Sequence, residues 1–173
     1  RLKNSFSIDE SLTLEADTYT RFYIAEVPKL KIEIVNDVPE RWGVSNKAMG
    51  FEIDNPANIL SNKLGCIISR DEPKDVFDIV TLSESYSFNW KEVYSQTLRK
   101  QIISETDIAM RLNSFPVQWL ADVPWSKRQI DYEDFADKLQ IIADDLILAR
   151  DNSLGMHKPK LEIAEINTQA QNS

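Results

Sequence analysis

Apolar and charged residues alternate over residues 30–35, which read Leu-Lys-Ile-Glu-Ile-Val. Because successive side chains of a strand point to opposite faces, the three apolar positions 30, 32 and 34 share one face. The preceding residues 20–27 are rich in β-branched and aromatic side chains, which favour strands. With a short connection at Pro28 between them, the two runs predict a pair of strands, and a further short strand is expected at 51–53.

From residue 54 onward the spacing of apolar residues becomes helical. Asp54-Asn55-Pro56 is a typical helix start, with a capping side chain followed by proline at the first helical position. The pattern predicts five helices: 56 to about 70, 74–83, one capped by Ser87 or Asn89 and ending near 103, one capped by Thr106 and ending at 112, and one starting at Asp131. In the last, Phe135, Leu139, Ile142 and Leu146 form a seam typical of packing inside a bundle rather than of a dimeric coiled coil.

These elements together predict an α+β chain. Residues 1–53 are expected to form a small, mostly antiparallel sheet region, and residues 54–150 a helical bundle. Residues 151–173 are polar and end in Gln, Asn and Ser, which predicts a flexible tail.

Composition narrows the possible functions. The 173 residues carry a net charge of −8, which argues against a broad basic surface for DNA but leaves room for a local nucleotide or RNA pocket. A single cysteine, Cys66, excludes a disulfide within the chain, and a zinc site or Ser-His-Asp triad would depend on the single histidine, His157. No apolar run is long enough to cross a membrane, and no signal peptide is visible, so a soluble cytoplasmic protein is expected.

The densest cluster of candidate functional residues is formed by Lys63, Arg70, Lys74, Asp75 and Asp78. Lys63 lies among apolar residues of the first predicted helix, and a lysine with a partly buried stem suits phosphate binding. Asp75 and Asp78 are three residues apart and therefore share a helix face. The alternatives are that Asp75 only stabilises the helix start and that the whole cluster is a structural ion-pair network.

Glu33 is the second candidate. It stands between two apolar residues of the alternating strand, so it points away from the apolar face. At the edge or end of a sheet such a carboxylate can bind a metal ion; the alternative is that it faces water.

Several of these segments resemble the AbiEii-type nucleotidyltransferase-like family. They are Ile-Leu-Ser-Asn-Lys-Leu at 59–64, Ser-Arg at 69–70 and Lys-Asp-Val-Phe-Asp-Ile at 74–79. The strand at 30–35 resembles a late strand of that family and precedes them in the correct order. The resemblance extends over about residues 20–100.

The resemblance implies a nucleotidyltransferase sheet followed by a helical region. Members of the family include toxins of abortive-infection toxin–antitoxin pairs, and some transfer nucleotides to RNA. It therefore implies a nucleoside triphosphate with Mg²⁺ as cofactor, an RNA acceptor and a cognate antitoxin protein as partner. The implied nucleotide-binding residues are Lys63, Arg70 and Lys74; Asp75 or Asp78 would be the later catalytic aspartate, and Glu33 a third catalytic acid and metal ligand.

One part of the family pattern is missing from this sequence. Members carry a glycine-containing turn followed by an Asp-x-Asp strand that holds divalent metals, and none of Gly43, Gly50, Gly65 and Gly155 precedes such a strand. Since the sequence begins with Arg1, we expect it to be the C-terminal portion of a longer protein and to be inactive alone. The alternative function is a non-catalytic module that binds a partner protein, RNA or a second copy of itself.

Overall fold

The structure is a computed structural model that describes residues 6–25, 29–36, 44–122 and 129–163. The chain divides into two compact units, Arg1–Pro39 and Glu40–Ser173, which we call the sheet unit and the helical unit. The division falls earlier than the predicted one at residues 53 and 54, so the segment around residues 46–53 belongs to the helical unit. The α+β class predicted from the sequence is confirmed.

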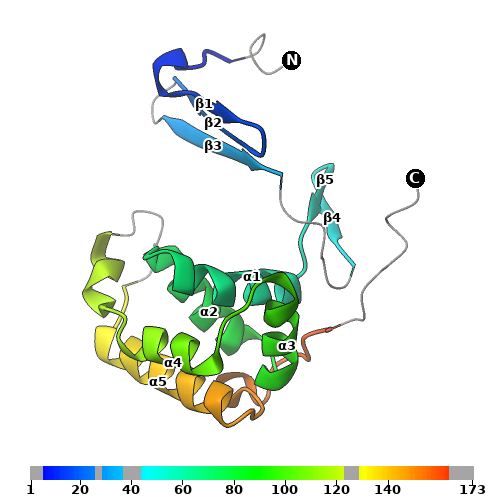
Figure 1. Ribbon diagram of the computed structural model, residues 1–173, viewed down its shortest axis with the longest axis vertical. Coiled ribbons are helices and arrows are strands. Elements are labelled where there is room, and N and C mark those ends of the chain that lie inside the picture. The colour runs from blue at the N-terminus through cyan, green and yellow to red at the C-terminus, as the bar shows by residue number, and fades with distance from the viewer. Residues whose placement is uncertain (1–5, 26–28, 37–43, 123–128, 164–173) are drawn as a thin grey trace. The chain divides into compact units, whose positions relative to one another are not determined.

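The sheet unit contains one three-stranded antiparallel sheet with the order β1-β2-β3 (Figure 1). A short 3-10 helix precedes it, and the elements are η2 (Glu10–Leu12), β1 (Leu14–Ala16), β2 (Tyr19–Ile24) and β3 (Leu30–Val35). The predicted strand pair is confirmed as β2 and β3, whereas β1 was not predicted. Its three residues are too few to show a period.

The register of the sheet puts apolar residues together on one face. Phe22 pairs with Ile32 and Ile24 with Leu30, while Glu33 lies on the opposite face. Phe22 and Ile24 are buried, but Leu30 is 56% exposed. The alternation of apolar and charged residues therefore determines the two faces of the sheet as predicted, although the side chains on the apolar face are only partly buried.

The helical unit begins with a small hairpin and continues with five α-helices (Figure 1). Its elements are β4 (Asn46–Ala48), β5 (Phe51–Ile53), α1 (Pro56–Ser69), α2 (Pro73–Ser85), α3 (Trp90–Lys100), α4 (Glu105–Asn113), η3 (Val117–Asp122), α5 (Tyr132–Ile147) and η4 (Ser153–Gly155). Met49 and Gly50 connect β4 and β5 with positive φ angles of 51° and 81°. Positive φ at both central positions is typical of a tight hairpin turn, and it puts a methionine where glycine or asparagine is usual.

Most helix starts follow the capping signals in the sequence. The side chains of Asn55, Asn89 and Asp131 accept hydrogen bonds from backbone N–H groups in the first turns of α1, α3 and α5. The prediction for α4 was wrong by two residues, because Ser104 and not Thr106 caps the helix by accepting from Asp107 N–H.

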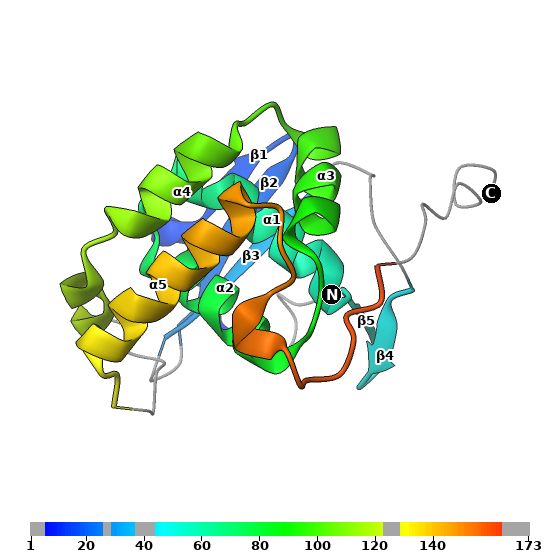
Figure 2. The ribbon, with the colours of Figure 1, turned by 90° about the horizontal axis from the view of Figure 1, so that it is seen from below.

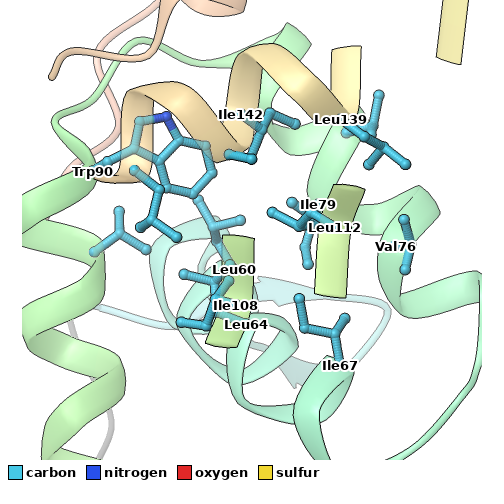
Figure 3. Close-up of a cluster of buried hydrophobic side chains, with 14 of the residues drawn as sticks. Leu60, Leu64, Ile67, Val76, Ile79, Trp90, Ile108, Leu112, Leu139 and Ile142 are labelled. Carbon is cyan, nitrogen blue, oxygen red and sulfur yellow. The ribbon is translucent and has the colours of Figure 1, made fainter. Parts of the chain in front are cut away.

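The core of the helical unit lies between the five helices. α1 packs against α2, α3 and α4, and α4 lies side by side with α5 (Figure 2). Figure 3 shows the centre of this core, which contains Leu60, Leu64, Ile67, Val76, Ile79, Trp90, Ile108, Leu112, Leu139 and Ile142. The four seam residues of the last helix are all buried, as expected of bundle packing. None of the helices in the described ranges has the length and hydrophobicity needed to cross a bilayer.

The segment after α5 departs from the predicted flexible tail over residues 151–163. Leu161 is 3% exposed, and its N–H donates to the carbonyl of Ser87. The buried side chain of Asn152 donates to the carbonyls of Ser83 and Tyr86, at 2.7 Å each. These bonds tie the segment to the α2–α3 connection. Residues 164–173 of the predicted tail lie outside the described residues.

Candidate functional site

Four of the six predicted site residues meet where the end of α1 approaches the start of α2. Lys63 projects from α1, and its ammonium contacts Asp75 Oδ1 at 2.7 Å and Asp78 Oδ2 at 2.6 Å, both on α2. Arg70 is the C-cap residue of α1. The connection between the two helices is short, and Pro73 opens α2 immediately after it, so the two aspartates come to lie beside the lysine.

Asp75 is the centre of this cluster, which we call the α1–α2 ion-pair cluster. Its Oδ2 accepts from Arg70 Nε at 2.7 Å, and its Oδ1 accepts from Arg70 Nη2 at 3.1 Å in addition to Lys63. A two-point contact of this kind fixes a guanidinium and a carboxylate in one plane. In the structure Asp75 contacts two cations, Arg70 and Lys63. The sequence alone left open that Asp75 only stabilises the start of the helix.

Asp75, which is buried, and Lys63, which is partly buried, are both held in their charged forms. Burial opposes the charge on Asp75, but the hydrogen bonds from Arg70 and Lys63 outweigh it and hold the pKa of the carboxyl below its ordinary value. Burial likewise opposes the charge on Lys63, and the hydrogen bonds to Asp75 and Asp78 outweigh it, so the pKa of this lysine is raised. At neutral pH Lys63 and Asp75 therefore form an ion pair of two charged groups.

The members differ in their access to solvent. The side chain of Asp75 is 0% exposed and that of Lys63 is 18% exposed, whereas Asp78 is 39% exposed and Arg70 47%. Asp75 is consequently a fixed internal partner of Lys63. Asp78 is its outer partner, and water or a ligand can replace Asp78 at the ammonium.

Lys74 and Glu33 are not part of this arrangement as the structure describes it. Lys74 lies in the first turn of α2, and no hydrogen bond or ion pair joins it to the cluster in the described ranges. Glu33 belongs to the sheet unit, where Tyr19 Oη donates to its Oε1 at 2.6 Å and Lys31 Nζ lies 3.1 Å from its Oε2. The hydrogen bond to Glu33 raises the pKa of Tyr19.

The predicted magnesium ion needs several oxygen ligands in one place. Within the part of the chain that the structure describes, no three or more acidic, histidine or cysteine side chains gather in a way that could hold a metal ion.

A second polar cluster was not predicted. Lys100, the last residue of α3, donates to Asn58 Oδ1 and Asn62 Oδ1 at 2.5 Å each and to Ser61 Oγ at 3.3 Å. The spacing of the two asparagines, four residues apart, places them on one face of α1. That spacing was the available signal, but the partner from α3 depends on how the helices pack.

Lys138 on α5 offers a comparison for Lys63. It too contacts two carboxylates, Glu84 Oε1 and Asp134 Oδ2, at 2.6 Å each, and its side chain is 23% exposed. Both of its partners are solvent-exposed, at 43% and 57%. Lys138 thus has similar contacts to Lys63 but has no buried carboxylate.

Comparison of the sequence with protein-family profiles and with curated proteins finds no match. Two solved structures are similar. One is described as a "putative nucleotidyltransferase from H. pylori"; it is 22% identical with a TM-score of 0.52, and the likeness covers 80% of this chain and 64% of that chain. The other, JHP933 from Helicobacter pylori, is 20% identical with a TM-score of 0.44, over 80% of this chain and 62% of that one.

The first of these likenesses shows that the chain has a nucleotidyltransferase-like fold. The chain spans less than two thirds of the length of either structure. At this level of identity the likeness concerns the arrangement of the backbone, and the roles of individual side chains have to be argued from their own contacts.

Proposed function

We propose that this chain is part of a nucleotidyltransferase-like protein and that the α1–α2 ion-pair cluster binds the phosphates of a nucleoside triphosphate. The observation that carries the proposal is Lys63, an ionised lysine held by a buried aspartate and, at a second contact, by the partly exposed Asp78. A lysine ammonium is a compact point charge suited to phosphate oxygens. The nucleotidyltransferase-like fold is the context in which such a lysine has a use.

We propose different roles for the two aspartates. Asp75 is saturated by Arg70 and Lys63, so it positions the lysine and does not reach a ligand. Asp78 is partly exposed and would release the ammonium when a phosphate oxygen takes its place. The freed carboxylate would then lie next to the bound phosphates, where it can orient an acceptor hydroxyl.

The finer parts of the proposal rest on the family resemblance. The parent protein would be of the AbiEii type and would transfer a nucleotide to an RNA acceptor as the toxin of a toxin–antitoxin pair. Lys74 and Glu33 would take part there as a phosphate contact and a metal ligand. Because this sequence lacks the Asp-x-Asp strand of the family pattern, this chain alone would bind nucleotide without transferring it.

The test is titration calorimetry of the chain with each of the four nucleoside triphosphates and magnesium. We expect binding that Lys63→Ala weakens at least about tenfold, a loss of about 1.4 kcal/mol. Lys138→Ala is the matched control, because it removes the same charge from a lysine with similar contacts. Thermal unfolding of each variant checks that the helical unit remains folded.

Two results would contradict the proposal: no binding by the unaltered chain, or equal binding by Lys63→Ala. Either would favour the alternative function of an interaction module. That alternative has support from the exposed apolar side chains near the end of α3, where Ile102 is 99% exposed and Leu98 is 40% exposed. A size measurement by analytical ultracentrifugation would then show whether the chain binds a second copy of itself.

A further inference from the structure

The connection between α2 and α3 is the middle of a small arrangement of three extended segments. Ser87 bonds through its N–H and its carbonyl to residues 159–161, and the carbonyl of Phe88 accepts from Asn152 N–H. Since successive residues of an extended chain direct their carbonyls to opposite sides, these bonds use both edges of the connection. The segment after α5, drawn orange in Figure 2, therefore lies along each edge.

The pairing of these segments places four polar side chains on one face. Ser87 is bridged to Lys160, and Asn89 is bridged to Asp151. Ser87 and Asn89 are two residues apart and point to the same face, and bridged residues share a face. The hydrogen bond of 2.8 Å from Asn89 Nδ2 to Asp151 Oδ1 agrees with this register. The basic Lys160 and the acidic Asp151 therefore stand at opposite edges of one face.

The four residues line a single cavity of about 370 Å³. Glu92 in the first turn of α3 and Met156 in the segment after α5 complete its walls. Pockets for small molecules occupy about 300 to 1,000 Å³, so the volume is sufficient for a ligand. The wall that contains Met156 lies against the α2–α3 connection because residue 155 is glycine, and a Cβ there would collide with the carbonyl oxygen of Tyr86.

The charged side chains of the cavity do not pair with one another. In the described ranges no ion pair joins Lys160 to Asp151 or to Glu92, and the side chain of Asp151 bonds instead to the uncharged Asn89. The two acidic groups belong to the side of Asn89 and the basic group to the side of Ser87. A molecule that carries a positive group at one end and a negative group at the other would complement both sides.

We infer that this cavity binds a small zwitterion of the amino-acid class. The ammonium group of the ligand would contact Asp151 and Glu92. Its carboxylate would contact Lys160 and accept from the hydroxyl of Ser87. The flexible thioether side chain of Met156 would pack against the apolar part of the ligand.

This site is separate from the α1–α2 ion-pair cluster. The cluster adjoins the start of α2 and the cavity adjoins its end, and the 13 residues of this helix span roughly 20 Å. The inference therefore does not depend on the proposed function, and the result of either test leaves the other standing.

The probes are the standard amino acids, each added at neutral pH up to about 10 mM to the whole chain and followed in ¹⁵N spectra. For the strongest binder the N-acetyl form removes the positive group and the carboxamide form removes the negative group. Affinities are compared for Asp151→Asn and Lys160→Gln, with Asp137→Asn and Lys158→Gln as matched controls outside the cavity. Asparagine at 151 keeps an acceptor for the amide of Asn89.

We expect backbone shifts at residues 87–92 and 151–160. Asp151→Asn and Lys160→Gln should each weaken binding at least about tenfold, whereas the two controls should bind like the unaltered chain. Asp151→Asn should cost nothing further with the N-acetyl form, because the group that contacts Asp151 is already absent from that ligand. Lys160→Gln should likewise cost nothing further with the carboxamide form.

No shifts at these residues with any amino acid would overturn the inference, and so would equal binding of the amino acid and its two derivatives. Equal weakening by the controls would show that only the net charge of the chain matters, which also contradicts the site. Thermal unfolding checks each variant. If Asp151→Asn unfolds, Lys160→Gln at an exposed position decides with the same two ligand forms.

Discussion

The two units of this chain differ in how much apolar surface they bury. Among the described residues of the sheet unit two apolar side chains, Phe22 and Ile24, are buried, and Leu30 and Ile34 on the same face are 56% and 54% exposed. The helical unit buries apolar residues from all five helices around one centre (Figure 3). A sheet of three strands needs a covered apolar face to be stable.

This difference in burial between the two units indicates which of them can hold side chains in fixed positions. Lys63, Asp75 and Lys100 project from helices that are anchored by buried apolar residues, so apolar packing fixes the backbone that carries them. Glu33 projects from β3, whose burial pattern is mostly exposed. A precise binding site is therefore expected on the helical unit, with the sheet unit contributing less.

The largest expected effect comes from separating the two units. Residues 40–173 alone should unfold in one cooperative thermal transition, because the helical core lies entirely within them. Residues 1–39 alone should show no such transition, since the two apolar residues that are buried in its described part, Phe22 and Ile24, cannot offset the entropy of ordering the strands. Circular dichroism during heating checks both, and a cooperative transition in residues 1–39 would contradict the comparison.

A smaller effect is expected from a single change in the helical core. Ile142 is 0% exposed, and Ile142→Ala should lower the free energy of unfolding by about 4 kcal/mol through lost burial and a cavity. Ile147→Ala, on the same helix at 48% exposure, is the matched control and should change it by about 0.5 kcal/mol or less. Urea unfolding followed by tryptophan fluorescence measures both. Equal effects would mean that α5 does not pack as described.

The smallest of the three expected effects concerns the buried carboxylate of Asp75. Asp75→Asn should cost about 3 kcal/mol at neutral pH, because it leaves two cations without their shared partner. The folded pKa of Asp75 lies below its ordinary value of 3.8, so its stabilisation is complete above that pH and is lost as the pH falls through the lowered pKa. The difference between the two proteins should accordingly shrink below about pH 4.

Unfolding curves at a series of pH values check this dependence. Lys138→Ala, which breaks ion pairs with exposed carboxylates, should cost no more than about 1 kcal/mol. A constant difference between the unaltered chain and Asp75→Asn down to pH 2 would show that the charge of Asp75 does not stabilise the fold.

Local signals in the sequence were enough to predict most of the fold. Asn55 and Asp131 carry their capping side chains next to the residues that they cap, and the seam from Phe135 to Leu146 has a helical period. The strand β1 and the hairpin strand β4, of three residues each, were not predicted from the sequence. The packing of Leu161 against the α2–α3 connection could not be predicted, because one apolar residue in a polar segment gives no pattern.

The candidate site was predictable in part for the same reason. Lys63, Arg70, Asp75 and Asp78 lie at the facing ends of two consecutive helices, so closeness in sequence brought them together in space. The different exposure of the two aspartates depends on the tertiary fold and was not visible in the sequence. Lys100 was missed because its partners are 38 to 42 residues away.

The bonds between the segment after α5 and the α2–α3 connection have a consequence for synthesis on the ribosome. The hydrogen bond from Leu161 N–H to the carbonyl of Ser87 can form only after Leu161 has been synthesised, 74 residues later (161 minus 87). At about 5–20 residues per second this takes roughly 4 to 15 seconds. For most of that interval the carbonyls of Ser83 and Tyr86 lack the amide of Asn152 that will bind them. The helical unit therefore completes its fold only after its last helix has left the ribosome, and the nascent chain is open to chaperones until then.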